Sequence, residues 1–476
     1  MINILIGLLR QKLTALILGA SGVGLIGLYQ SLIITSAALG SLGLGTAGTR
    51  QIADAVSRDD ATRVASVRTA LLWTTMALAV ITAAIVWFLR FEIATRMLDD
   101  KSLASAIGWL SIATGFTIAS GSQIALLTGM RRIGDVARAI VYSSVLATIV
   151  GIAALVMLGE RGLLLFVIAT PIATFLVGVY FVAKLPPAIR TGRSWKERAP
   201  QIRLMVALGL PIMIGGFAGL LAQTLLRIIV QRELSLVELG YFQAAATLSM
   251  TYLGFVLQAM STDYYPRLTA AIHDREAARR IMNEQSEVAL LLAGPILIAM
   301  LGWAPWLLQL LYAPEFAPAA SILRWQVLAD LLKVISWPIA FVIVAKGQGK
   351  TYMVNECLFS AILVAAVWMA IPLVGLKATG IGYFICYLLY LPTVFWLAKR
   401  AIGYWPSPSV IWIATLISLC LGVTFAAAEW EPLWGAAVAL PLTVGFGLFA
   451  GLKLNNILGG GLKEQFNRLM RPRASR

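Results

Sequence analysis

Long apolar segments dominate the chain, and most charged residues lie between them. A helix needs about 20 mainly apolar residues to cross the hydrocarbon core of a bilayer. Fourteen segments approach this length, and the second is the weakest because it is short and rich in glycine. They begin near Leu13, Ala38, Thr69, Leu103, Val136, Gly162, Leu204, Glu238, Val288, Ala319, Met353, Ala378, Val410 and Leu433. The pattern predicts an all-α polytopic membrane protein with about 14 transmembrane helices.

The composition narrows the class of protein further. Hydrophobic residues make up 59% of the chain and charged residues only 13%, which excludes a water-soluble enzyme, a disordered chain and a disulfide scaffold. The three cysteines, Cys357, Cys386 and Cys420, all lie in apolar segments, so we expect no disulfide framework, no metal site and no cofactor.

The basic residues orient the predicted helices. The net charge of +16 would suggest a nucleic-acid partner in a soluble protein. Here, if the N-terminus is inside, 29 of the 38 Lys and Arg residues fall in inner segments and only six in outer ones. This asymmetry follows the positive-inside rule of membrane loops. We therefore expect no nucleic acid as partner, and both termini in the cytoplasm.

Weak self-similarity at an offset of about 215 residues suggests an internal repeat. Residues 130–134 align with 345–349, and Ala183-Lys184 aligns with Ala398-Lys399. Two six-helix halves of equal orientation are typical of transporters, whose site lies where the halves meet. The predicted organisation is an N-lobe bundle at 1–184, a cytoplasmic basic linker at 185–203, a C-lobe bundle at 204–399, and two extra helices with a basic cytoplasmic tail at 400–476.

Charged residues within the predicted spans indicate a site, because a charge at the centre of a membrane helix costs about 3 kcal/mol. Lys333 lies near the centre of the tenth span, and Asp330 shares its helical face. Cations outnumber acids in these spans, so the predicted cavity attracts an anion, and arginine suits phosphate in particular. The candidate cavity residues are Arg227, Arg324, Lys333, Gln223, Gln30 and Arg50, and the candidate ion-coupling residues are Asp330 and Glu356.

Structural interpretations of the same residues stay open. Asp330 and Lys333 can neutralise each other as an ion pair in the bundle core. Arg227 and Arg324 can extend to the outer headgroups, and Arg50 can anchor the inner face.

The stretch 325–338 (WQVLADLLKVISWP), followed by Ala345-Lys346-Gly347 and Glu356, resembles the Wzx-type flippases. The stretches 19–30 and 42–48 resemble the same family. The resemblance implies a V-shaped, two-lobed flippase of the MOP superfamily, which also holds MATE exporters. It implies an undecaprenyl-pyrophosphate-linked oligosaccharide as cargo and the bacterial inner membrane as location. Asp330 and Lys333 match the family's Asp-x-x-Lys, and Glu356 matches its next acidic residue.

The chain differs from this family in two features, and the resemblance implies further partners. Relatives commonly have twelve spans rather than fourteen, and many have proline where Ala20 stands. Besides the lipid-linked oligosaccharide and membrane lipids, the expected partners are a glycan polymerase and chain-length proteins.

The leading hypothesis is a flippase that translocates the O-antigen or a related repeat unit by alternating access through a cationic cavity. Transport is driven by the membrane potential alone or by coupling to protons or sodium. The first alternative is a MATE-like multidrug or ion exporter, although the first span lacks the acidic residue that cationic drugs favour. A membrane glycan polymerase or glycosyltransferase is the second, and a purely structural membrane protein is the third.

Overall fold

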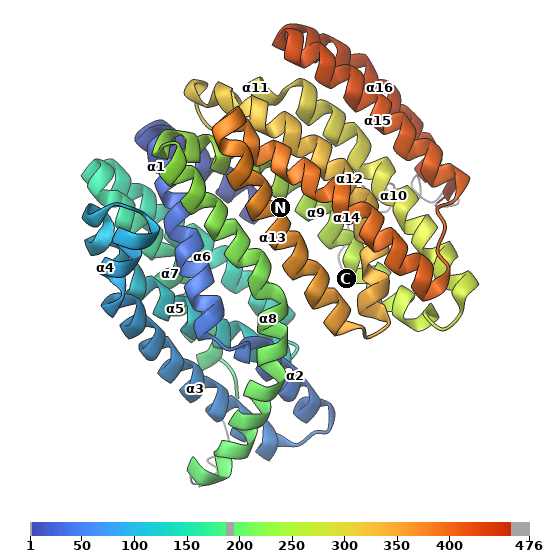
Figure 1. Cartoon of the computed structure of the whole chain (residues 1–476). Helices are drawn as coiled ribbons and strands as arrows, with labels where there is room; N and C mark the ends of the chain where they lie inside the picture. The colour runs from blue at the N-terminus through green and yellow to red at the C-terminus, as the bar shows by residue number, and fades with distance from the viewer. Residues whose placement is uncertain (1, 187–194, 458–476) are drawn as a thin grey trace, which may run out of the picture. The chain divides into compact units, whose positions relative to one another are not determined.

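The computed structural model describes residues 2–186 and 195–457, and its regular secondary structure there is helical (Figure 1). Residues 187–194 of the predicted linker, and the basic tail at 458–476, lie outside the described residues.

The chain divides into two compact units. The first holds Met1–Gln243 with Leu311–Glu315 and Asn355–Val364, and the second holds Ala244–Leu310, Phe316–Val354 and Ala365–Arg476. The predicted lobe boundaries at 184 and 204 remain a prediction. The longer helices are α1 (Ile2–Gly40), α2 (Leu44–Ser57), α3 (Ala61–Phe88), α5 (Ala104–Gly129), α6 (Ile133–Leu158), α7 (Leu163–Ala183), α8 (Trp195–Glu233), α9 (Leu236–Ala271), α10 (Arg275–Gly302), α11 (Ala304–Leu311), α12 (Ala320–Ala345), α13 (Gly349–Val374), α14 (Lys377–Ile402), α15 (Pro408–Trp430) and α16 (Pro432–Ile457). Short helical turns include α4 (Arg90–Glu92) and η3 (Gly159–Gly162).

Each of the 14 predicted apolar segments falls on a helix of the described chain. Length and composition alone qualify ten described stretches as membrane spans, and one of these, Ile133–Ala183, contains both α6 and α7. The protein is therefore a multi-pass membrane protein, and the number of 14 spans remains a prediction.

Gly19 divides α1 into two helical segments, 2–18 and 20–40. Its backbone has φ 65° and ψ −168°, a conformation that glycine adopts readily because it lacks a Cβ. Before Gly19 the chain lies along α7. Arg10 Nη1 donates to Thr170 Oγ1 at 2.8 Å, and Leu18 packs in one cluster with Leu163 in the first turn of α7. The segment 2–18 therefore runs antiparallel to α7.

After Gly19 the chain lies along α8 and the start of α9. A Cβ added at Gly24 would lie 2.7 Å from the nitrogen of Gly240, and Thr35 Oγ1 lies 2.6 Å from Thr224 Oγ1 further down. The starts of α7 and α9 both line one cavity with Leu18, so they lie at the same end of the unit. The chain therefore reverses direction at Gly19, and we assign 20–40, about 30 Å long, as the second crossing.

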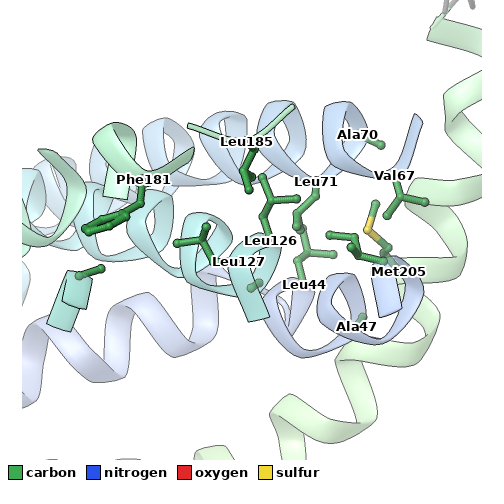
Figure 2. Close-up of a cluster of buried hydrophobic side chains, with 13 residues drawn as sticks. Leu44, Ala47, Val67, Ala70, Leu71, Leu126, Leu127, Phe181, Leu185 and Met205 are labelled. Atoms are coloured by element: carbon green, nitrogen blue, oxygen red, sulfur yellow. The ribbon is translucent and has the colours of Figure 1, made fainter. Parts of the chain in front are cut away.

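The segment predicted to begin at Ala38 is not one membrane helix. It spans the last turn of α1 and the helix α2, which is 14 residues and about 21 Å long. Leu44 and Ala47 of α2 pack against Leu71 and Leu126 in a buried cluster of the first unit (Figure 2). The apolar residues of α2 occupy one face only, which explains why α2 packs on neighbouring helices instead of crossing the bilayer.

The helix bounds support the internal repeat. Helices α6 and α13 are both 26 residues long, and their bounds differ by 216 residues at each end. Each is followed directly by a glycine with φ 58°, Gly159 after α6 and Gly375 after α13. This helix pair agrees with an offset of about 215 residues, and the division into two repeated halves remains a prediction.

The two extra helices, α15 and α16, run side by side and pack on α10 within the second unit (Figure 1). Lys453 Nζ of α16 lies 2.8 Å from Glu287 Oε1 of α10, and Ser409 Oγ of α15 donates to the same oxygen at 3.0 Å. Large apolar side chains such as Trp412 and Leu419 are exposed on α15, as expected of a surface that faces lipid. The extra helices are therefore fixed to the second unit.

Candidate functional site

A polar stripe on α12 lines a small cavity in the second unit. Gln326, Asp330 and Lys333 are spaced i, i+4 and i+7, which places them on one face of the helix. The cavity has a volume of about 30 Å³, enough for one water molecule or ion. Ser249 of α9 and Tyr387 of α14 also line it.

The two charged residues of the stripe have different environments. Asp330 is 6% exposed, and its Oδ2 accepts a hydrogen bond of 2.6 Å from Ser249 Oγ. Lys333 is half-buried, and its charge acts on Asp330. Within the described part of the chain, no acceptor lies within hydrogen-bond or salt-bridge distance of Lys333 Nζ. The ammonium can therefore bind an anion without first breaking a direct ion pair.

Gln326 adds an amide oxygen that accepts no hydrogen bond from the described residues. The residue is 4% exposed, and its Oε1 is buried without a hydrogen-bond partner among the described residues. Buried polar atoms normally have a partner, so this oxygen favours a water molecule or a donor group of a ligand in the cavity.

Arg227 is a charged residue of α8 in the first unit. Its Nε donates to Gln243 Oε1 at 3.0 Å, and its Nη1 donates to the carbonyl oxygen of Gln223 at 2.8 Å. The guanidinium also lies over the ring of Phe242, with 5.9 Å between its Cζ and the ring centre. Arg227 and Gln223 are therefore in contact on α8, and Gln243 and Phe242 of the neighbouring helix α9 fix the orientation of the arginine.

Arg324 lies apart from the α12 stripe. It precedes Lys333 by nine residues, which at 100° per residue places the two on opposite faces of the helix. Its side chain is 7% exposed, and its Nη1 lies 3.4 Å from Glu429 Oε1 at the end of α15. Its charge is therefore compensated within the second unit.

The other predicted residues lie in three different places. Gln30 is half-buried on the 20–40 segment of α1, and Arg50 is exposed on α2. Glu356 is half-buried on α13, in the stretch that belongs to the first unit, whereas Asp330 belongs to the second unit. The roles of these residues remain predictions.

Sequence reasoning missed Arg10 as a charged residue within a span. Arg10 lies inside the apolar stretch Leu5–Gly40, where its guanidinium carbon is 4.1 Å from the centre of the Phe166 ring. A first span that begins near Leu13 leaves Arg10 outside the membrane, at the inner face. Sequence reasoning also missed Gln326, although its spacing of four residues from Asp330 could have indicated it.

Comparison with known proteins identifies a family and relatives of this chain. Residues 15–321 match the polysaccharide biosynthesis protein family. The chain is 24% identical over 413 residues to a protein named lipid III flippase from Escherichia coli (strain K12), covering 81% of this chain and 92% of the relative. A protein of the same name from Shigella flexneri matches equally.

Two solved structures share the fold. The lipid II flippase MurJ in an inward closed conformation has a TM-score of 0.72 at 14% identity, covering 95% of this chain and 97% of MurJ. An inward-facing multidrug resistance transporter of the MATE family and MOP superfamily has a TM-score of 0.71 at 16% identity, covering 84% of this chain and 94% of the transporter.

These relatives are flippases and transporters rather than catalysts, in agreement with the prediction that the chain is not an enzyme. The family match and the names of the curated relatives support the resemblance to flippases, and the two solved structures share the all-α membrane fold. Because the family match covers more than half of its residues, this chain belongs to the polysaccharide biosynthesis protein family.

Proposed function

We propose that the protein is a flippase for an undecaprenyl-pyrophosphate-linked oligosaccharide, the O-antigen or a related repeat unit. It moves this lipid from the inner to the outer leaflet of the bacterial inner membrane. The family match and the flippase names of the relatives support this proposal.

The observation that carries the proposal is Lys333. A lysine in the middle of a long apolar helix is costly, and here its ammonium lacks a direct partner among the described residues while lining a cavity. A pyrophosphate supplies the charge that compensates it when the cavity, which has a volume of about 30 Å³ in this structure, widens during transport. Arg227 is the proposed second contact in the first unit, where Gln223 and Gln243 hold its guanidinium in place.

The proposed mechanism is alternating access. The headgroup enters an inward-open cationic cavity while the prenyl tail stays in lipid, and the lobes then rock to open outward. Polar groups exposed to hydrocarbon are costly, so the protein must shield the sugars during the passage. Arg324 is left out of the proposed site because Glu429 compensates its charge.

The membrane potential can drive this step. With both termini in the cytoplasm, as proposed, transport moves two negative charges outward. The electrical gain is about 4.6 kcal/mol per 100 mV if these charges are uncompensated. Coupling of protons or sodium at Asp330 or Glu356 is the alternative source of energy, and a glycan polymerase and chain-length proteins are the proposed partners.

The test is transport by purified protein in liposomes. A fluorescent undecaprenyl-pyrophosphate-linked oligosaccharide should become accessible at the opposite leaflet only in vesicles that contain the protein. The same vesicles should not accumulate ethidium, and the gene should restore surface glycan in a flippase-null strain. Ethidium transport without lipid transport would favour the MATE-like exporter. Glycan elongation by the purified protein would favour a polymerase.

A further inference from the structure

A second cavity lies in the first unit, where α1 reverses direction. Its volume is about 370 Å³, within the range of small-molecule sites. Leucines form its apolar walls, and they come from both segments of α1, from α7 and from the start of α9. These residues are Leu18, Leu25, Leu163, Leu164 and Leu236.

Tyr29 is the fixed polar group inside this cavity. The residue is 3% exposed, and its hydroxyl has no hydrogen-bond partner among the described residues. Tyr29 lines the cavity, so its hydroxyl is available to donate a hydrogen bond to an acceptor oxygen of an occupant. Because the chain reverses at Gly19, Leu18 before the turn and Tyr29 after it line the same space.

The rim of the cavity carries one charge of each sign. Glu160 and Arg161 are consecutive residues in the turn η3, and both are exposed. Neither makes a salt bridge with any residue that the structure describes. Arginine binds phosphate through charge-assisted hydrogen bonds, and a carboxylate accepts hydrogen bonds from an ammonium group.

We propose that this cavity binds one glycerophospholipid with a phosphoethanolamine headgroup. Arg161 binds the phosphate, Glu160 accepts from the ammonium, and Tyr29 donates to an ester carbonyl below them. The leucines contact the first part of an acyl chain. This site does not depend on the proposed flippase activity.

The charge around the cavity disfavours a prenyl pyrophosphate as occupant. Asp100 is close enough for its charge to act on Tyr29, and Glu160 adds a second carboxylate. A headgroup with several negative charges would be repelled by both carboxylates, and Arg161 is the single arginine that would offset this repulsion. A zwitterion satisfies Glu160 and Arg161 together.

The experiment is native mass spectrometry of purified, delipidated protein. It is titrated with phosphatidylethanolamine, phosphatidylglycerol, phosphatidylcholine or undecaprenyl pyrophosphate, each with the same protein preparation. Phosphatidylethanolamine should bind with the highest affinity. Tyr29→Phe removes only the hydroxyl and should weaken this binding about fivefold, the value of one hydrogen bond. Tyr142→Phe, at a 53% exposed tyrosine outside the cavity, is the matched control and should change nothing.

Ser21→Trp keeps the proposal testable if Tyr29→Phe does not fold. Ser21 is exposed at the cavity, so a bulky ring there should block entry and abolish phosphatidylethanolamine binding. Equal binding of all four lipids, preferred binding of undecaprenyl pyrophosphate, or unchanged binding by a folded Tyr29→Phe or Ser21→Trp variant would overturn the proposal.

Discussion

The pair of Arg324 and Glu429 permits a prediction in which replacing either partner destabilises the protein, but by different amounts. The Arg324 side chain is 7% exposed and that of Glu429 is 34% exposed, with 3.4 Å between Nη1 and Oε1. The Nε and Nη2 atoms of Arg324 are buried without a hydrogen-bond partner among the described residues. Glu429→Gln keeps the shape of the side chain and removes the only anion paired with this arginine in the described chain.

The expected losses in the free energy of unfolding differ because the two residues differ in burial. Removing one partner of a buried pair costs about 3–5 kcal/mol, and the partial exposure of Glu429 favours a loss of about 3 kcal/mol for Glu429→Gln. Arg324→Met leaves Glu429 within 3.5 Å of Lys377, near solvent. It should therefore cost no more than about 1 kcal/mol. The double variant should resemble Arg324→Met, because no buried charge is left without a partner.

The assay is reversible unfolding of the detergent-solubilised protein, with lipid transport measured on the same variants. Lys377→Met is the control, since it removes the exposed partner of Glu429 and leaves the buried contact. A loss from Glu429→Gln as small as that from Lys377→Met would refute the argument from burial. Loss of transport in a stable Arg324→Met variant would return Arg324 to the cargo site, as the sequence suggested.

Two further predictions concern packing within each unit. A Cβ at Gly240 would collide with the backbone of α1, so Gly240→Ala should destabilise the protein by about 1–3 kcal/mol. Gly216→Ala is the control, because a Cβ there meets open space. Equal unfolding midpoints of the two variants would contradict the close approach of α1 and α9. Tyr264→Phe removes a buried hydrogen bond of 2.7 Å to the carbonyl of Pro338 and should lower the free energy of unfolding by about 1–2 kcal/mol. Tyr265→Phe, at a 37% exposed site, should lower it much less. Thermal unfolding of the four variants measures both effects, and an unaffected Tyr264→Phe variant would show that this bond does not contribute.

The helices could be predicted from the sequence because the bilayer imposes their length and apolar composition. Hydropathy carries no direction, however, so it could not show that the chain reverses at Gly19 inside one apolar stretch. That reversal places Arg10 in the membrane and makes 20–40, rather than the segment from Ala38, the second crossing.

Only part of the α12 stripe and its surroundings could be predicted, because sequence patterns show local spacing and not contacts between helices. Asp330 and Lys333 share a face that helical periodicity makes visible, but Ser249 comes from another helix and no local pattern links it to them. The pairing of Arg324 with Glu429 joins residues 105 positions apart, so it too depends on the tertiary structure.

The central claim is that the ammonium of Lys333 binds the pyrophosphate of the cargo. The most direct measurement is the initial rate of lipid-linked oligosaccharide transport in liposomes by Lys333→Met and Lys333→Arg, with Lys377→Met as control. Loss of one charged contact should slow Lys333→Met at least about tenfold, while Lys333→Arg retains most of the rate and Lys377→Met all of it. Transport by a folded Lys333→Met variant at the rate of the unmodified protein would contradict the account.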